Sequence, residues 1–257
     1  MLSAIPNVGN LRRRRRPLEI LVDLLLPTDC GSCGAVLGWH AAHGSCLKCW
    51  TSPTSVSPVG CHVCGLELPP IERPSDPTAA LCGRCSARDG DRPPLLACVL
   101  YEDAARSLLL QGKLEPRREL LDDLGLQVAA RVAAWRSSAG TFDRVVPVPS
   151  HPWVDLRRGF SPAERIARQV ARRIDVPLDR RILRRSLASP LAFKRLDRGS
   201  RLGSGPHLYA RRRPLSGDRV LLIDDVVTTG TTLANGARAL YAAGAGEVMA
   251  AVWAIKT

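Results

Sequence analysis

Apolar and polar positions follow two different patterns along the chain, and the change comes near residue 97. Downstream of it, short apolar runs alternate with stretches whose apolar positions recur at helical spacing. Strands are predicted at 97–101, 144–148, 219–224 and 247–254, and helices at 119–135, 162–174 and 232–243. Strands that alternate with amphipathic helices predict βαβ units, and therefore an α/β fold with a mostly parallel sheet.

The same change of pattern predicts how the chain is divided. Its 257 residues suffice for one or two domains. We expect a basic leader with a short amphipathic helix at 1–27, a cysteine-rich module at 28–96, and the α/β domain at 97–257. Within that domain, residues 187–217 are rich in Gly, Ser, Pro and Arg. They predict a long loop or hood, and such loops are usually functional or disordered.

The first residues superficially resemble a secretory signal, because the arginine run 12–16 precedes the apolar stretch 18–26. Glu19 and Asp23 interrupt that stretch, and no small-residue cleavage site follows it. No apolar run reaches the roughly 18 residues that a membrane helix needs. We therefore expect a cytoplasmic protein without membrane insertion. The arginine run itself reads as a disordered leader or an over-long start, although contact with nucleic acid is an alternative.

Charge is distributed unevenly along the chain. The formal net charge is +13, and residues 144–213 by themselves carry an excess of 13 basic over acidic side chains. Such an excess indicates anionic partners, namely phosphates or single-stranded DNA. The alternative is an Arg-rich solvated surface. Aromatic residues make up only 4% of the chain, so the stacking platforms of a dedicated single-strand reader are scarce.

Eight of the nine cysteines form four Cys-x2-Cys pairs. They are Cys30 and Cys33, Cys46 and Cys49, Cys61 and Cys64, and Cys82 and Cys85. Two such pairs complete a closed four-sulfur zinc site, so the spacing predicts two structural zinc ions. Disulfides are the competing reading, which a reducing cytoplasm disfavours. Sequential pairing follows from chain proximity, and interleaved pairing stays open. The ninth cysteine, Cys98, is predicted to be a buried core thiol.

Two carboxylates and a hydroxyl-rich turn follow the apolar run at 220–223. The two acids are Asp224 and Asp225, and the turn comprises Thr228, Thr229, Gly230, Thr231 and Thr232. Backbone N–H groups at the start of a helix can enclose a phosphate dianion, while the carboxylates accept hydrogen bonds from sugar hydroxyls. The alternative is a buried strand followed by a capped helix, in which adjacent carboxylates would be costly. The pattern favours a sugar-phosphate site.

The segment 220–232 resembles the 5-phosphoribosyl-1-diphosphate binding motif of type I phosphoribosyltransferases. Nearly the whole chain resembles the ComF family associated with competence, in which a double zinc ribbon precedes a phosphoribosyltransferase domain. Besides the cysteine pairs, the supporting segments are Leu24-Leu-Leu-Pro27, Val146-Pro-Val-Pro149 and Arg157-Arg-Gly-Phe160. The resemblance implies a phosphoribosyltransferase-type, Rossmann-like fold with a mostly parallel sheet and a small N-terminal zinc module.

The resemblance also implies roles for individual residues. Asp224 and Asp225 would bind the ribose hydroxyls, directly or through Mg²⁺, and residues 228–232 would bind the 5-phosphate. Ser150, His151, Arg157 and Arg158 would face the pyrophosphate. The chain departs from the family pattern at Ser161, where Asn is common, and at 110–112, where a Lys-aromatic pair is frequent. The hood also departs from the family pattern, so the acceptor base is not readable.

Two functions are compatible with these observations. In the first, the chain is an enzyme that transfers the phosphoribosyl group of 5-phosphoribosyl-1-diphosphate and releases pyrophosphate. In the second, a non-catalytic phosphoribosyltransferase-fold protein handles single-stranded DNA during DNA uptake, together with a helicase-like competence partner. The first is supported by the 220–232 segment and the second by the basic segment 144–213.

Overall fold

A computed structural model describes residues 29–30, 32–37, 45–56, 61, 82, 92–114, 119–186, 208–210 and 215–256. Its strands are β1 (Leu95–Leu100), β2 (Arg144–Pro147), β3 (Leu183–Arg185), β4 (Leu208–Ala210), β5 (Arg219–Val227) and β6 (Glu247–Ile255). Its helices are α2 (Leu47–Thr51), α4 (Asp103–Gly112), α5 (Leu120–Ala139), α6 (Pro152–Arg158), α7 (Pro162–Ile174) and α9 (Thr231–Ala242). Of these helices, none is both long and apolar enough to cross a bilayer.

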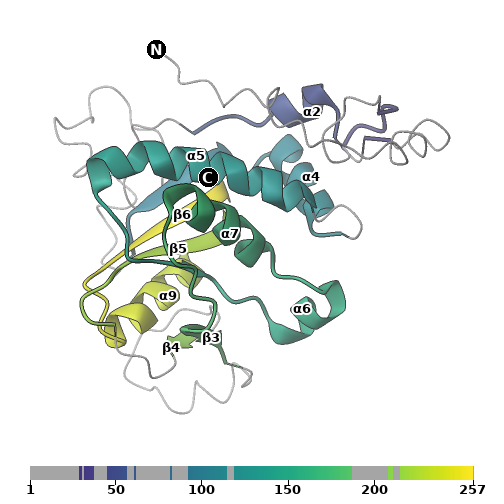
Figure 1. Cartoon of the computed structure of the whole chain (residues 1–257). Coiled ribbons are helices and arrows are strands. Elements are labelled where there is room, and N and C mark those ends of the chain that lie inside the picture. Colours follow the sequence, from purple (N-terminus) through teal and green to yellow (C-terminus); the bar gives the residue numbers. More distant parts are fainter. Residues whose placement is uncertain are drawn as a thin grey trace.

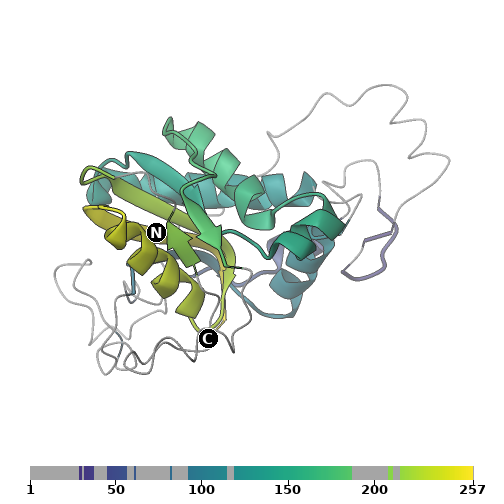
Figure 2. The ribbon, with the colours of Figure 1, turned by 90° about the horizontal axis from the view of Figure 1, so that it is seen from below.

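The central sheet has four strands in the order β1-β6-β5-β2, and every neighbouring pair is parallel. Helices α5 and α7 cover one face, whereas α9 and the antiparallel β3–β4 pair cover the other (Figure 1). Figure 2 shows α9 running along the sheet on the side opposite to α5. The α/β fold with a mostly parallel sheet is therefore confirmed.

Burial on both faces explains why the two central strands are almost continuously apolar. On β5, Leu221 and Ile223 pack into the core under α5 and α7, while Val220 and Leu222 pack into the core under α9. Successive side chains of a strand point to opposite faces, and here both faces are core. The two cores hold β5 rigidly, and β5 carries the predicted acidic pair.

Helix α7 was predicted with its observed bounds because its local signals agree. The Ser161 hydroxyl accepts a hydrogen bond from the backbone N–H of Glu164 at 3.4 Å, and Pro162 occupies the first turn. The helix ends at Asp175, which adopts a left-handed conformation with φ of 54°. Its buried positions are Pro162, Ala163, Ile166, Ala167, Val170, Ala171 and Ile174.

The structure differs from the predicted elements at several strand and helix ends and in two additional helices. Strand β1 begins two residues earlier than predicted, and α5 extends to Ala139 rather than ending at 135. Helices α4 and α6 were not predicted. The sequence before α4 carries no strong start signal, and the sequence of α6 indicates a loop. Part of the predicted hood is ordered, because β4 at 208–210 pairs with β3. Residues 187–207 and 211–214 of the predicted hood lie outside the described residues.

The N-terminal region packs onto the α/β domain. Residues 54–56 run antiparallel to β1, with the backbone N–H of Val56 donating to the Cys98 carbonyl at 2.9 Å. Trp50 of α2 is buried in the core beneath α5. Cys98 is buried as predicted, and burial raises the pKa of its thiol to about 12. The segment that carries the first four cysteines therefore shares a core with the sheet.

Candidate functional site

The acidic pair lies within β5 and not after it. The strand was predicted to end at 224, but it continues through Val227 because β6 extends alongside it to Ile255. Strand β2 ends earlier, at Pro147 opposite Ile223. Asp224 and Asp225 therefore sit where β5 projects beyond its β2 neighbour, at the carboxyl end of the sheet. Ligands of open parallel sheets bind at this end.

Asp225 is neutralised by a lysine that the sequence analysis did not single out. Lys113 follows the C-terminal end of α4, and its Nζ atom lies 2.6 Å from Asp225 Oδ2. Both side chains are largely buried, with 21% and 12% of their surfaces exposed. Two charges at this separation, partly removed from water, interact far more strongly than a surface pair. A lysine just after a short helix carries no sequence signal that would connect it to residue 225.

Asp224 occupies a different environment from its neighbour. Burial and the negative charge of Asp225 raise the pKa of the Asp224 carboxyl well above its usual range, although the backbone N–H of Asp225 and Lys113 oppose the shift. That N–H donates to Asp224 Oδ1 at 2.9 Å. The pair thus holds one carboxylate that is already compensated and one that favours a proton or an additional cation. A divalent cation or sugar hydroxyl donors would satisfy the second carboxyl.

The hydroxyl-rich turn leads from β5 directly into α9. Thr228 and Thr229 are exposed, and α9 begins at Thr231, one residue earlier than predicted. Gly230 adopts a left-handed conformation with φ of 76° at the helix N-cap, which glycine accommodates without strain. The Thr229 and Thr231 hydroxyl oxygens are 3.0 Å apart. The Thr231 N–H donates to the Thr229 hydroxyl at 3.4 Å. The N–H groups of the first turn of α9 have no carbonyl partner within the helix, and with the hydroxyls they are the donors that anions bind.

Arg92 reaches the same turn from the segment that precedes β1. A β-carbon placed on Gly230 would lie 3.5 Å from a terminal nitrogen of the Arg92 guanidinium and 3.6 Å from its central carbon. Arg92 is half-buried, and Pro93 and Pro94 follow it. Nothing in the local sequence connects Arg92 to the site, because 138 positions separate it from Gly230 and no motif marks it.

The predicted pyrophosphate residues lie around α6. Ser150 and Ser161 have their hydroxyl oxygens 3.2 Å apart, and Arg158 lies 6.0 Å from the centre of the Phe160 ring. Arg157 is exposed on α6. Within the described part of the chain, no ion pair or hydrogen bond joins Arg157 or Arg158 to the acidic pair or to the turn at 228–230. The structure thus brings together Asp224, Asp225 and the turn, and leaves the two arginines apart from them.

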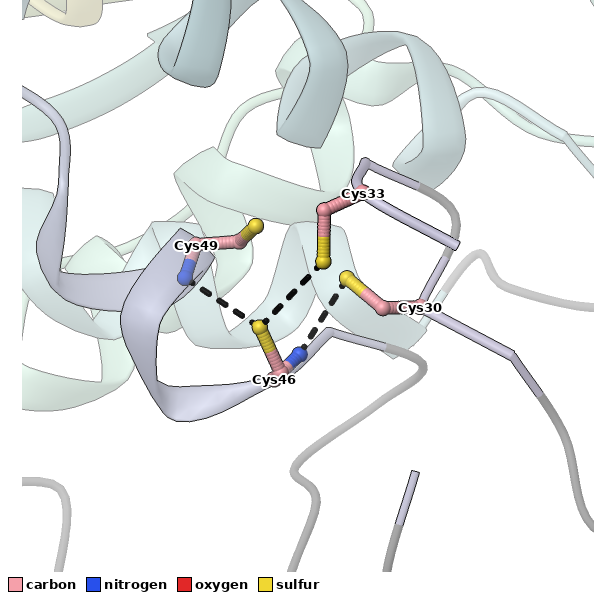
Figure 3. A group of neighbouring side chains, drawn as sticks. All are labelled: Cys30, Cys33, Cys46 and Cys49. Atoms are coloured by element: carbon pink, nitrogen blue, oxygen red, sulfur yellow. Dashed lines mark hydrogen bonds between the residues drawn. The ribbon is translucent and has the colours of Figure 1, made fainter. Parts of the chain in front are cut away.

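Four cysteines form a compact cluster of sulfur atoms (Figure 3). Cys30 and Cys33 come from one turn, and Cys46 and Cys49 from the N-terminal end of α2. The four Sγ atoms all lie within 4.8 Å of one another, and those of Cys33 and Cys46 are 3.7 Å apart. Sulfurs bound tetrahedrally to zinc at about 2.3 Å lie about 3.8 Å apart, whereas a disulfide bond is about 2.05 Å long. The donor set fits zinc.

Hydrogen bonds tune the thiols of this cluster. Burial alone would raise the pKa of the Cys30 thiol, but hydrogen bonds from backbone N–H groups outweigh burial and lower this pKa to about 6. One of these donors is the backbone N–H of Cys46, which lies 3.4 Å from Cys30 Sγ. Burial and the neighbouring thiols raise the pKa of Cys49 to about 12. Sequential pairing within the first four cysteines agrees with the sequence prediction. Of the second predicted set, Cys61 is buried and Cys82 half-buried, while Cys64 and Cys85 lie outside the described residues.

A buried glutamine connects the cysteine cluster to α4. The Gln111 side-chain amide donates to the Ser32 hydroxyl at 2.7 Å and accepts from the Ser45 hydroxyl at 3.5 Å. Ser32 lies between Cys30 and Cys33, and Ser45 precedes Cys46. Because Gln111 is only two residues from Lys113, one helix contacts both the cysteine cluster and the acidic pair.

Comparison with known proteins covers both parts of the chain. The phosphoribosyl transferase domain family matches residues 118–256, and the double zinc ribbon domain family matches residues 21–86. The chain is 27% identical over 214 residues to DNA utilization protein YhgH of Escherichia coli strain K12, covering 82% of this chain and 89% of that protein. It is 25% identical over 219 residues to Competence protein F of Haemophilus influenzae, covering 84% and 91%.

Among solved structures, the chain is similar to a purine phosphoribosyltransferase from Pyrococcus horikoshii, with 20% identity and a TM-score of 0.33 over 53% of this chain and 73% of that one. The phosphoribosyl transferase match alone spans more than half of the 257 residues. With the zinc ribbon match in front of it and the two bacterial relatives along most of its length, the chain belongs to the ComF family of phosphoribosyltransferase-domain proteins.

Proposed function

We propose that the protein binds 5-phosphoribosyl-1-diphosphate and transfers its phosphoribosyl group to an acceptor, with release of pyrophosphate. The observation that carries the proposal is the position of Asp224 and Asp225 at the carboxyl end of β5, directly before the turn into α9. The nine residues 224–232 thus contain both carboxylates that can accept from sugar hydroxyls and N–H groups that can donate to a phosphate.

Each part of the site has a defined task in this proposal. The turn at 228–230 and the first residues of α9 hold the 5-phosphate, and the carboxylates hold the ribose hydroxyls. Mg²⁺, held by Asp224 and Asp225 through water, would neutralise charge on the diphosphate as it leaves. Transfer of this kind needs no covalent nucleophile, since the protein contributes by positioning and by electrostatic stabilisation. Arg157 and Arg158 of α6 would face the pyrophosphate.

The zinc ribbon is structural in this proposal. A four-sulfur site has no open position for catalysis, and this one is bonded to α4 through Gln111. Two zinc ions are expected, one in the described cluster and one in the second set of four cysteines. Zinc thiolates persist where thiols stay reduced, so we place the protein in the cytoplasm.

The test is an assay with the zinc-loaded protein, 5-phosphoribosyl-1-diphosphate, Mg²⁺ and a panel of purine and pyrimidine bases. Pyrophosphate release that depends on a base and disappears in a variant with Asp224→Asn and Asp225→Asn is expected. If the protein binds the sugar diphosphate tightly but releases no pyrophosphate with any base, it is a binding protein and not an enzyme. Absence of binding would overturn the proposal.

A second candidate function is binding of single-stranded DNA. Trp153 on α6 is 67% exposed, more than any other described aromatic side chain, and Leu156 beside it is 74% exposed. Arg157 follows Trp153 by four residues, so both lie on one face of α6. An exposed indole next to a guanidinium suits a stacked base and its phosphate. The printed names of the two relatives, DNA utilization protein and Competence protein F, point the same way.

Fluorescence anisotropy with labelled oligo(dT) at several salt concentrations tests the second candidate. Trp153→Ala should weaken binding by a factor of about 5 to 100, which is the usual range for one stacked base. Arg157→Gln should reduce the salt slope by about one. Tyr209→Ala, an exposed aromatic on β4, is the matched control. A flat salt dependence would contradict this function, and a helicase-like partner would be sought only once DNA binding is established.

A further inference from the structure

The segment joining the zinc ribbon to the sheet supplies a cation next to the turn at 228–230. The Arg92 guanidinium lies beside Gly230, with its three nearest atoms 3.5, 3.6 and 3.8 Å from the position that a Gly230 β-carbon would occupy. Outside Gly230 and its chain neighbours, the three heavy atoms nearest to that position thus all belong to one guanidinium. The open space of the glycine is therefore bordered by a positive charge.

Arg92 is held in place by the residues that follow it. The Pro94 carbonyl accepts a hydrogen bond from the backbone N–H of Ala250 on β6 at 2.8 Å. Pro93, which lies between Arg92 and Pro94, is buried. The rings of the two prolines fix the φ angles of their own backbone. The Arg92 backbone thus starts from an anchored, stiff segment. A stiff backbone loses less conformational entropy when a ligand arrives.

The guanidinium has no competing carboxylate in the described part of the chain, where no ion pair or hydrogen bond of its side chain is found. Half-buried arginines usually pair with an acid or an anion, because desolvating the charge is otherwise costly. The N-terminus of α9, with its unsatisfied N–H groups, adds positive potential at the same place. A cation with no partner among the described residues, beside a turn of amide and hydroxyl donors, matches a phosphate dianion in charge and geometry.

We propose that Arg92 binds the 5-phosphate of the sugar phosphate held by the turn at 228–230. This inference rests on the proposed function. It makes the junction between the zinc ribbon and the α/β domain part of the ligand site, although the junction lies outside the segment that resembles the 5-phosphoribosyl-1-diphosphate motif. Arg92 would act on the phosphate by a charge-assisted hydrogen bond and would leave the ribose hydroxyls to Asp224 and Asp225.

Calorimetric titration with ribose 5-phosphate and with 5-phosphoribosyl-1-diphosphate tests the inference on the full zinc-loaded chain. Arg92→Gln should lower the affinity for both ligands by a similar factor of about ten or more, because both carry the 5-phosphate. Arg92→Lys should lose less, since the charge remains but the bidentate contact does not. Melting temperatures of both variants should stay near that of the parent, since no ion pair or hydrogen bond of the Arg92 side chain is found among the described residues.

Arg238→Gln is the matched control, because Arg238 is an exposed arginine in the same helix that begins at this turn, and it bonds Asn235 instead. It should bind both ligands like the parent. The inference is overturned if Arg92→Gln also binds like the parent, or if Arg238→Gln loses as much affinity, which would indicate a general field effect. If the parent binds neither sugar phosphate, the proposed function fails, and this inference fails with it.

Discussion

Lys113 Nζ lies 2.6 Å from Asp225 Oδ2 and thereby joins the end of α4 to the carboxyl end of β5. The same helix carries Gln111, which bonds Ser32 and Ser45 within the first cysteine cluster. A continuous series of contacts therefore runs from the cysteine cluster through α4 to the acidic pair. The zinc ribbon positions a helix that completes the electrostatics of the proposed site.

Replacing Lys113 should destabilise the protein. Lys113→Met leaves a largely buried Asp225 without its cation, and we expect a loss of about 2 kcal/mol, below the 3–5 kcal/mol of a fully buried pair. Thermal denaturation measures it. Lys256→Met, an exposed lysine after β6, serves as the control and should change little. Equal melting temperatures for the two variants would show that the ion pair does not stabilise the fold.

Replacing the two carboxylates one at a time should shift stability in opposite directions. Since the pKa of Asp224 is raised, the folded protein retains a proton that the unfolded chain has released, and stability falls as pH rises from about 4 to the raised pKa. Asp224→Asn removes this penalty and should raise the melting temperature at neutral pH by roughly 2–4 °C, while Asp225→Asn should lower it by breaking the pair with Lys113.

Melting curves recorded from pH 4 upward separate the two effects. The difference in melting temperature between Asp224→Asn and the parent should be small near pH 4. It should increase with pH until Asp224 is fully ionised in the folded parent. An advantage that stays constant across this range would mean that Asp224 ionises in the folded protein as readily as in the unfolded chain.

The elements with agreeing local signals were predictable, as α7 illustrates with its cap, proline and apolar positions. The position of the acidic pair near the carboxyl end of β5 was predictable, because acids that follow an apolar run stand out in any sequence. The contacts of Lys113 with Asp225 and of Arg92 with Gly230 were not, since they depend on how α4 and the segment before β1 pack against the sheet. The length of β5 also depended on its neighbour β6, which no local pattern of β5 reveals.

Zinc binding to the first cysteine cluster should release protons. Cys49, whose pKa is about 12 in the metal-free cluster, must lose a proton at neutral pH, whereas Cys30, with a pKa of about 6, is already mostly a thiolate. Calorimetry of zinc binding in buffers of different ionisation enthalpy counts the protons. The Cys49→Ser variant should release fewer. Zinc uptake without any proton release would contradict the assignment.

Gly230 and Gly159 allow backbone strain to be separated from ligand binding. Both adopt left-handed conformations, with φ of 76° and 77°. Alanine at either position should cost about 1–2 kcal/mol of stability. Only Gly230→Ala should also weaken binding of ribose 5-phosphate, because it alters the turn that holds the 5-phosphate, whereas Gly159 ends α6. Equal loss of affinity in both variants would attribute the effect to general destabilisation.

The central claim is that the carboxyl end of β5 binds 5-phosphoribosyl-1-diphosphate. Its most direct test is calorimetric titration, with Mg²⁺ present, of the parent and of the variant carrying both Asp224→Asn and Asp225→Asn. Amides cannot supply the anionic acceptors that ribose hydroxyls and Mg²⁺ favour. The parent should bind, and the double variant should not, although its thermal denaturation curve should show that it is folded. A double variant that binds like the parent would contradict the claim.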